Sequence, residues 1–242
     1  MSEPERACPS CASALPTQCF ACPACMLALR EEGGRLVPLY PPIRPSAALY
    51  AVDLRNPAVL PMGLDLAKVA ETNVVRFARA PEGLNVQVLA GKAFEWAMPF
   101  MRLTDACVSL RVPAAGGAAR ITLIARSSKI GTYRKYYGFM VSVTRRQACF
   151  IRMLAGSLGQ KSTFTELTPW GGHDALAALN PSSVLEMRAQ GPMLEGLVDG
   201  RRVAVTHDPV LGMGHLGLRI EAESSGPAHA TIGGLEIAGV MA

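Results

Sequence analysis

The chain has 242 residues, of which half are hydrophobic and 18% are charged, and its formal net charge is +5. This composition excludes an intrinsically disordered chain, allows one large domain with a small appendage, and permits an anionic partner without requiring one. No run of about 18 apolar residues is present, and residues 1–7 are polar, so neither a membrane span nor a secretory signal is expected. We therefore expect a cytoplasmic protein of bacterial type.

A cluster of cysteines marks the N-terminal end of the chain. Five of the seven cysteines fall within residues 8–25, where they include two CPxC pairs separated by ten residues. Each CxxC pair forms a turn that directs both sulfur atoms inward, and two such turns supply the tetrahedral set of thiolates that Zn²⁺ prefers. Clustered pairs also favour a reducing compartment over a disulfide framework. The sequence therefore predicts a structural Zn²⁺ site with the ligands Cys8, Cys11, Cys22 and Cys25.

Residues 8–26 resemble the short bacterial zinc ribbon, in which two CPxCG knuckles flank an apolar segment that contains proline. Leu15-Pro16 stands where that family has its own Leu-Pro. Ala12 and Met26 occupy the positions of the knuckle glycines, so the freedom to adopt positive φ beside the metal is lost there. Three alternatives stay open: Cys19 as a ligand in place of a CPxC cysteine, a redox-active CxxC pair, and a ribbon that holds no metal.

Prolines define a boundary after the cysteine cluster. Residues 30–48 contain a Gly pair and four prolines. This composition excludes helix and favours an extended, polyproline-like tether. We therefore predict three parts, a zinc ribbon at 1–29, a linker at 30–48 and a β domain at 49–242.

Short segments with alternating apolar and polar residues fill the predicted β domain. Turns rich in Gly, Pro and Ser separate them, and no amphipathic helices alternate with them, which is typical of an antiparallel β-sandwich of roughly ten to twelve strands. Asp199-Gly200 lies between two apolar runs and predicts a tight hairpin. One or two helical turns are expected at 65–71. The other predicted strands include 74–77, 84–89, 106–112, 120–126, 137–144 and 148–154.

The order of these pieces resembles the concanavalin A-like jelly-roll superfamily, which includes laminin-G-like, laminarinase-type and 3-keto-disaccharide hydrolase-like domains. The resemblance rests on an F-x-W strand, a YYGF strand and a C-terminal pattern of turn and core positions. The matching C-terminal residues are Leu194, Gly196, Val198, Asp199, Gly200, Val203, Gly214, Gly217, Leu218, Ala230, Ile232, Leu235 and Ile237. The resemblance implies an all-β, antiparallel jelly-roll β-sandwich.

Catalytic residues are not recognisable in this part of the sequence. Laminarinase-type domains place two catalytic glutamates on one strand in an E-x-D-x-E pattern, and this triplet is absent. Glu186 and Glu195 flank one turn, and two surface acids on neighbouring strands are usually solvated. Cys107 and Cys149 lie in apolar strands and are predicted to be buried thiols. We therefore predict a protein without enzymatic activity.

The densest polar feature is the stretch 126–152, where basic and aromatic side chains interleave. Such side chains can hold a nucleic-acid backbone or an acidic glycan, or they can form the solvated turns of a strand pair. Trp170, in a loop with neighbouring glycines, can stack on a sugar ring or plug the edge of the sandwich. The candidate ligand surface comprises Trp170, Tyr133, Tyr136, Arg134, Lys135, Arg145 and Arg146.

These features predict a non-catalytic binding or assembly protein. Its zinc ribbon would contact a protein partner or a second copy of the chain, and its β-sandwich would present a ligand or subunit interface. One alternative is a lectin-type carbohydrate-binding protein, or less readily a glycan-active one. Another is nucleic-acid binding through the ribbon and the basic stretch 126–152, which would weaken steeply with salt.

Overall fold

The computed structural model describes residues 7–9, 14–15, 22, 29–33, 35–39, 42–59, 66, 74–112, 114–117, 119–130, 133–154, 163–180, 182–223 and 226–241. Within these ranges the chain consists almost entirely of β-strands, with one short helix, α2 (Asp174–Ala177). No described helix has the length and hydrophobicity needed to cross a membrane.

Three antiparallel sheets and one separate hairpin organise the strands. The seven-stranded sheet has the order β12 (Thr163–Glu166), β11 (Gln147–Leu154), β10 (Tyr133–Ser142), β9 (Ala119–Ile130), β17 (Gly214–Ala222) and β6 (Ala93–Leu103), with β13 (Gly171–Gly172) paired to β11. The six-stranded sheet has the order β16 (Arg201–His207), β15 (Met193–Val198), β14 (Val184–Gln190), β7 (Ala106–Arg111), β19 (Gly234–Val240) and β3 (Pro45–Asp53). The four-stranded sheet has the order β4 (Val75–Ala80), β5 (Gly83–Val88), β18 (Ala228–Ile232) and β8 (Ala114–Gly117), and the hairpin pairs β1 (Leu29–Glu32) with β2 (Arg35–Pro38).

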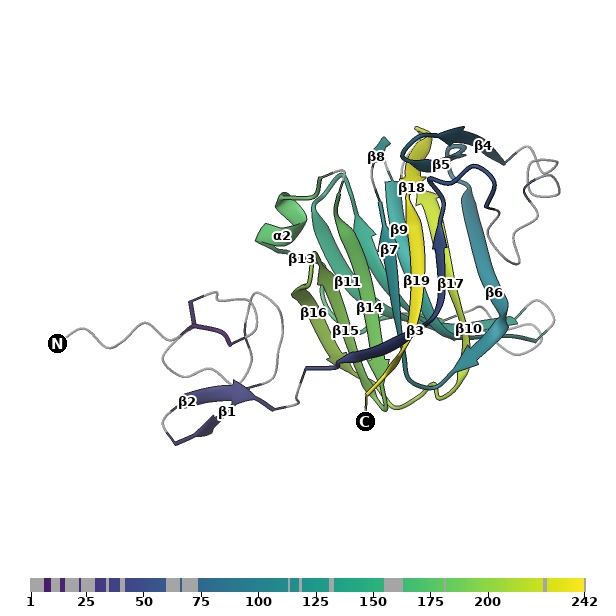
Figure 1. The fold of residues 1–242 in the computed structure, drawn as a ribbon. Helices are drawn as coiled ribbons and strands as arrows, with labels where there is room; N and C mark the ends of the chain where they lie inside the picture. The colour runs from purple at the N-terminus through teal and green to yellow at the C-terminus, as the bar shows by residue number, and fades with distance from the viewer. Residues whose placement is uncertain are drawn as a thin grey trace.

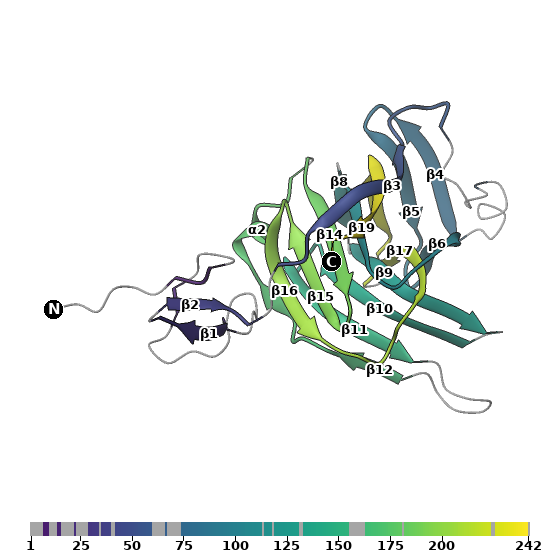
Figure 2. The ribbon, with the colours of Figure 1, turned by 60° about the horizontal axis from the view of Figure 1, so that its bottom comes forward.

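The two large sheets form the layers of the sandwich, and the four-stranded sheet lies at the end that is drawn uppermost in Figure 1. The β1–β2 hairpin lies outside the sandwich, on the side of β16, in both Figure 1 and Figure 2. This arrangement confirms the predicted all-β, antiparallel jelly-roll β-sandwich.

Alternation along the strands builds the core between the large sheets. In β10, Tyr137 and Phe139 point inward, and both side chains are fully buried, as is Phe150 on the neighbouring strand β11. The Phe139 and Phe150 rings lie 5.3 Å apart. Burying an aromatic side chain of this size contributes about 1.5–3 kcal/mol, so these strands hold the layers together.

Local turn chemistry behaves as the sequence predicts. Asp199 and Gly200 have φ angles of 50° and 73°, and they join Val198 directly to Arg201 between β15 and β16. Two successive residues with positive φ define a type I′ turn, whose twist matches that of the flanking strands. The predicted hairpin is therefore confirmed.

Three expectations need correction or lie outside the described residues. The stretch 30–48 is not an uninterrupted polyproline-like tether, because it contains most of the β1–β2 hairpin and the start of β3. Among the described residues, the β domain has seventeen strands, β3 to β19, rather than ten to twelve, because several pairings involve strands of four residues or fewer. The helical turns expected at 65–71 fall outside the described residues except for Leu66, which is helical.

Candidate functional site

A continuous chain of ion pairs crosses the outer face of the seven-stranded sheet. Antiparallel register sets Arg120 on β9 opposite Glu221 on β17, and Arg219 on β17 opposite Glu95 on β6. Because side chains that face each other across an antiparallel pair interact directly, opposite charges meet at these two positions. Glu223 and Arg134 join the set through contacts outside this register. We call this set the arginine–glutamate chain, and it runs in the order Glu223, Arg120, Glu221, Arg219, Glu95 and Arg134.

The contacts within the arginine–glutamate chain are close. Arg120 lies 2.9 Å from an oxygen of Glu221 and 2.9 Å from an oxygen of Glu223, so a single guanidinium holds both carboxylates. Arg219 lies 2.8 Å from the other oxygen of Glu221 and 3.7 Å from Glu95. Ser142 also donates a hydrogen bond of 2.7 Å to Glu223. These shared partners fix the side chains in one arrangement without a bound ligand.

The arginine–glutamate chain reaches solvent and is electrically balanced. Its side chains range from 6% exposed at Glu223 to 39% exposed at Arg134. Three guanidinium groups, which only donate hydrogen bonds, alternate with three carboxylates, which only accept them. The face therefore offers alternating donors and acceptors with no net charge.

An apolar cluster adjoins the arginine–glutamate chain on the same face. It consists of Ile124, Tyr136, Met140, Cys149 and Ile151, with Met153 and Trp170 packed against it. Gly138 keeps this floor flat, because a Cβ atom there would lie 2.8 Å from a methyl group of Thr122.

Trp170 joins the apolar cluster to the arginine–glutamate chain. The guanidinium carbon of Arg120 lies 5.6 Å from the centroid of the Trp170 ring, within the range of a cation–π interaction. The Trp170 side chain is partly exposed. Thr168, two residues earlier, accepts a hydrogen bond of 2.8 Å from the amide of Phe150 and anchors the loop to β11.

Burial makes the floor of this face chemically inert. Burial raises the pKa of the Cys149 thiol to about 12, and the neighbouring Glu166 adds to the shift. Burial also raises the pKa of Tyr136. Both groups therefore stay neutral near pH 7 and add no charge to this face.

The structure places the predicted ligand residues in different parts of the molecule, including the arginine–glutamate chain, the apolar cluster and the turn between β10 and β11. Arg134 belongs to the arginine–glutamate chain, and Trp170 lies beside it. Tyr136 is on the same face but only 5% exposed, so it contributes to the floor and does not offer an open ring. Lys135 is exposed, and the side chain of Tyr133 lies outside the described residues.

Arg145 and Arg146 lie away from this face, in the turn between β10 and β11. Arg146 donates hydrogen bonds to the carbonyl groups of Leu176, at 3.2 Å, and Leu179, at 3.5 Å, so it fastens the turn to the segment around α2. The predicted surface therefore does not form as one unit.

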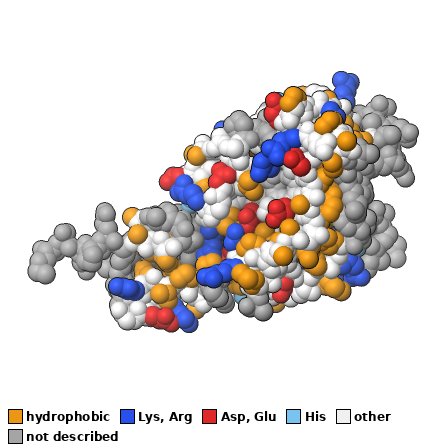
Figure 3. All heavy atoms as spheres, in the orientation of Figure 1, with side chains coloured by type: hydrophobic (Ala, Val, Ile, Leu, Met, Phe, Trp, Pro, Cys, Tyr) orange, Lys and Arg blue, Asp and Glu red, His pale blue; other side chains and the backbone are white. Residues whose placement is uncertain are grey.

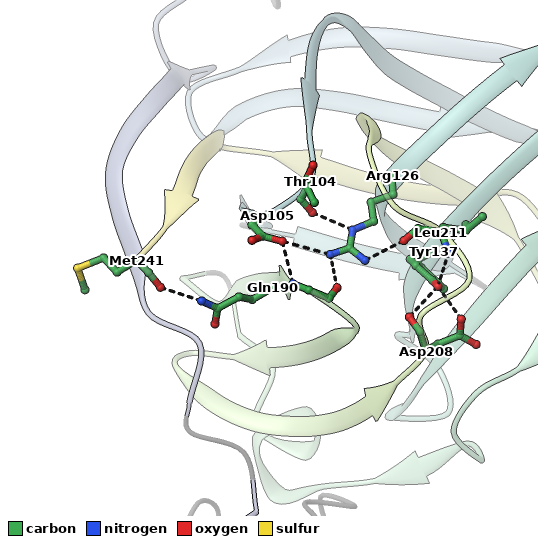
Figure 4. Close-up of polar contacts among 9 residues, drawn as sticks. Thr104, Asp105, Arg126, Tyr137, Gln190, Asp208, Leu211 and Met241 are labelled. Carbon is green, nitrogen blue, oxygen red and sulfur yellow. Dashed lines mark hydrogen bonds and ion pairs between the residues drawn. The ribbon is translucent and has the colours of Figure 1, made fainter.

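The basic stretch 126–152 likewise does not form one surface, because two of its arginines turn inward. Figure 4 shows Arg126 held by the carbonyl groups of Thr104 and Leu211, at 2.8 and 2.9 Å, and lying near Tyr137. Arg152 pairs with Asp208, which also accepts a hydrogen bond of 2.6 Å from Tyr137. These contacts fasten the loop after β16 over one end of the sandwich.

The predicted zinc ligands are only partly described. Cys8 and Cys22 are 3% and 0% exposed and belong to one cluster with Leu29 and Ile43, whereas Cys11 and Cys25 lie outside the described residues. No group of three or more His, Cys, Asp or Glu side chains in the described part of the chain is arranged to hold a metal ion.

Glu186 and Glu195, on the outer face of the six-stranded sheet, each have a separate basic partner. Glu186 pairs with Arg188 and accepts a hydrogen bond of 3.3 Å from Cys107. Glu195 pairs with Arg202 and accepts a hydrogen bond of 3.2 Å from the amide of Ile43. Their distribution is that of a structural clamp, not of an acid and base that face a common substrate.

A hollow of about 380 Å³ opens on this sheet between Asp53, Arg55, Arg111 and Glu236. The side-chain hydrogen bond from Arg55 lowers the pKa of Asp53 to about 2. Figure 3, in the orientation of Figure 1, shows one face of the molecule, on which acidic and basic side chains lie among hydrophobic ones. Within this hollow, Arg55 and Asp53 are therefore already paired with each other.

No family model matches this sequence, and no curated protein matches it. Solved structures are similar in fold. A protein of unknown function with a galectin-like fold from Bacillus subtilis is 11% identical, with a TM-score of 0.52 over 82% of this chain and 99% of that one. The Crh5 transglycosylase in its apo form is 12% identical, with a TM-score of 0.50 over 82% and 88%. The carbohydrate-binding module CBM66 from Bacillus subtilis is 18% identical, with a TM-score of 0.42 over 69% and 89%.

The comparison with the transglycosylase corrects one prediction. The missing E-x-D-x-E triplet predicts a protein without enzymatic activity, but this chain shares its fold with a transglycosylase, so the fold itself accommodates an enzyme and that prediction is corrected. The structure also places Glu221 and Glu223 two residues apart under one guanidinium. The alternation of Arg219, Glu221 and Glu223 is visible in the sequence and is the signal that a search for the full triplet passes over.

Proposed function

We propose that this chain binds carbohydrate through the outer face of the seven-stranded sheet, at Trp170 and the arginine–glutamate chain. The observation that carries the proposal is the continuity of six alternating charged side chains beside a partly exposed tryptophan. A sugar hydroxyl both donates and accepts hydrogen bonds, so it matches a surface of alternating donors and acceptors. The apolar face of a pyranose ring matches the indole of Trp170.

Charge balance favours a sugar over a nucleic acid. A nucleic-acid surface needs unpaired positive charge along a groove, because phosphate contacts dominate its affinity. Here the guanidinium groups of Arg120, Arg134 and Arg219 are each paired with a glutamate. The fold, which is shared with a transglycosylase, adds support at the level of architecture.

A glycan array followed by calorimetry on the best ligand tests this proposal. Trp170→Ala and Glu221→Gln are each expected to weaken binding at least tenfold, which corresponds to about 1.4 kcal/mol. Glu236→Gln, an exposed glutamate on the other large sheet, is the matched control and should leave affinity unchanged. Equal affinity of all four proteins, or no glycan ligand at all, would overturn the proposal.

A second candidate function is glycan cleavage or transfer at the same face. Glu221 and Glu223 supply two carboxylates under one arginine, and glycosidases of most families use such a pair. One carboxylate attacks the anomeric carbon while a protonated acid donates to the leaving oxygen, after which water or a second sugar displaces the carboxylate. Binding ranks first because both glutamates accept hydrogen bonds from Arg120, so one guanidinium already engages both carboxylates.

Mass spectrometry of labelled oligosaccharides incubated with the protein distinguishes these functions. Shortened or elongated products that disappear in both Glu221→Gln and Glu223→Gln would support catalysis. Binding without any product would leave carbohydrate recognition as the function of this face.

For the N-terminal segment, we propose a structural Zn²⁺ held by Cys8, Cys11, Cys22 and Cys25. Cys8 and Cys22 fit this role, because both are buried in the same cluster, which includes Met193 on β15 and Val205 on β16. Native mass spectrometry before and after a strong chelator is expected to show the loss of one Zn²⁺ per chain. A chain that carries no zinc, or whose zinc survives Cys8→Ser, would contradict the site.

A further inference from the structure

The four-stranded sheet carries a second polar hollow, which is lined by none of the residues of the arginine–glutamate chain. Its volume is about 590 Å³, and its lining comes from β4, β5 and β18. Inward-facing residues of these strands, such as Val86 and Ala230, belong to the core. The alternate residues therefore face outward, on the side of an antiparallel sheet that is commonly polar and solvated. What sets this hollow apart is the way its polar side chains are aligned.

Register aligns three hydrogen-bonding side chains in that hollow. Arg76 on β4 is paired with Gln87 on β5, and Gln87 is paired with His229 on β18. Neighbouring strands lie about 4.8 Å apart, so the row spans roughly 10 Å. All three side chains are exposed, and none has a polar partner among the residues that the structure describes.

The neighbours of this row keep it open. Gly116 on β8 is paired with His229, and a Cβ atom there would lie 2.4 Å from Nε2 of the imidazole. The imidazole therefore lies across β8 in space that only glycine leaves free. In the next row, Thr231 donates a hydrogen bond of 2.5 Å to the amide oxygen of Asn85, which fixes the orientation of the amide.

The lining has a positive and donor-rich character. No acidic side chain belongs to the described lining of this hollow. Arg76 carries a permanent charge on a planar group that binds carboxylates and sulfates through two parallel hydrogen bonds. Gln87 adds an amide that both donates and accepts hydrogen bonds, and His229 adds an imidazole with two ring nitrogens along the row. This differs from the arginine–glutamate chain, where each guanidinium is already paired.

We propose that this hollow is a second glycan site, which binds the carboxylate or sulfate of an acidic sugar residue through Arg76, with Gln87 and His229 contacting neighbouring hydroxyl groups. The proposal rests on the proposed carbohydrate function for the nature of the ligand, but it uses none of the same residues. Together the two sites would allow one chain to hold two portions of an acidic polysaccharide.

Calorimetry with trigalacturonate and its fully methyl-esterified form tests the proposal, because the two probes share the same sugar rings and only the first carries carboxylates. Trigalacturonate should bind the native protein, and Arg76→Gln should weaken that binding at least tenfold. Arg111→Gln, an exposed strand arginine on the six-stranded sheet, is the matched control and should change nothing. Circular dichroism of each variant verifies that the sheets are intact.

A Trp170→Ala background separates this proposal from the function of the other face. If the Trp170→Ala variant still binds trigalacturonate and the double variant with Arg76→Gln does not, the second site is supported. This result holds even if the proposed site at Trp170 binds no glycan. Equal binding of the charged and esterified probes, or insensitivity to Arg76→Gln, overturns the second site and leaves the first untouched. Inorganic sulfate alone binding as tightly as trigalacturonate would also overturn it, because the sugar would then contribute nothing.

Discussion

The two large sheets of the sandwich share one core but use charge differently on their outer faces. On the seven-stranded sheet the arginine–glutamate chain is partly exposed and continuous over four strands. On the six-stranded sheet the Glu195–Arg202 pair is 2% and 5% exposed, and Glu195 accepts a hydrogen bond from the amide of Ile43. The comparison teaches that exposure, more than residue type, separates the proposed ligand surface from a structural clamp.

The clamp has a clear structural target. Arg188 donates a hydrogen bond of 2.7 Å to the carbonyl of Ile43, so that one residue is held through both of its backbone groups. Ile43 also packs with Leu29, Met193 and Val205. The chain between the N-terminal hairpin and β3 is therefore fastened to the outer face of the six-stranded sheet.

Removing one arginine from each face should show the difference most strongly. Arg202→Met leaves the Glu195 carboxylate buried without its ion-pair partner, and we expect a loss of about 3–5 kcal/mol in the free energy of unfolding. Arg219→Met removes a partly exposed pair and should cost less than about 1 kcal/mol. Urea denaturation of both variants measures these values, and similar losses in the two would contradict the comparison.

Replacing a glycine with alanine should also destabilise the protein more inside the sandwich than on its outer face. The difference in unfolding free energy is expected to be smaller than for the two arginine variants. At Gly196 on β15, a Cβ atom would lie 2.3 Å from the Phe139 ring in the core. Gly196→Ala is therefore expected to cost about 1–3 kcal/mol through overpacking. At Gly138 the nearest atom is a methyl group of Thr122 at 2.8 Å, so Gly138→Ala should cost less. Thermal unfolding of the two variants provides the test, and the reverse order would contradict it.

Sequence reasoning predicts the local parts of this molecule well. The Asp199-Gly200 turn follows from two residues that tolerate positive φ, and the inward direction of Tyr137 and Phe139 follows from alternation. Neither depends on which strands become neighbours. The buried state of Cys107 and Cys149 follows from their apolar strands in the same way.

The candidate site depends on long-range register, which the sequence does not reveal. Arg120 meets Glu221 only because β9 pairs with β17, a hundred residues later in the chain.

Arg126 shows how alternation itself can fail. Its φ angle of 53° and the register shift opposite Lys135 and Tyr137 mark a β-bulge, which reverses the direction of the side chain. A basic residue that alternation places on the surface thus ends up inside the sandwich.

The clamp should also give the protein a distinctive dependence on pH. Burial raises the pKa of Glu195, against the opposing effect of Arg202. The folded state therefore holds this proton to higher pH than the unfolded state, whose value is 4.5. The resulting stability is complete below pH 4.5 and is lost as the pH rises through the folded pKa. We therefore expect the unfolding free energy of the Glu195→Gln variant, measured from pH 4 upward, to increase relative to that of the native protein across this window. A constant difference would contradict the assignment.

The smallest effect is expected for the reactivity of the two buried cysteines, because measuring it requires no substitution on either face. Cys107 lies on the outer face of the six-stranded sheet and Cys149 on that of the seven-stranded sheet, and burial raises the pKa of each thiol from 9.0 to about 12. Since only the thiolate reacts, a shift from 9.0 to about 12 lowers its population about a thousandfold. Iodoacetamide at mildly alkaline pH should modify neither residue in the native protein and both in concentrated urea, as peptide mass spectrometry can show. Native labelling at Cys149 alone would mean that the apolar cluster beside Trp170 opens, and the floor of the proposed carbohydrate site would then not be rigid.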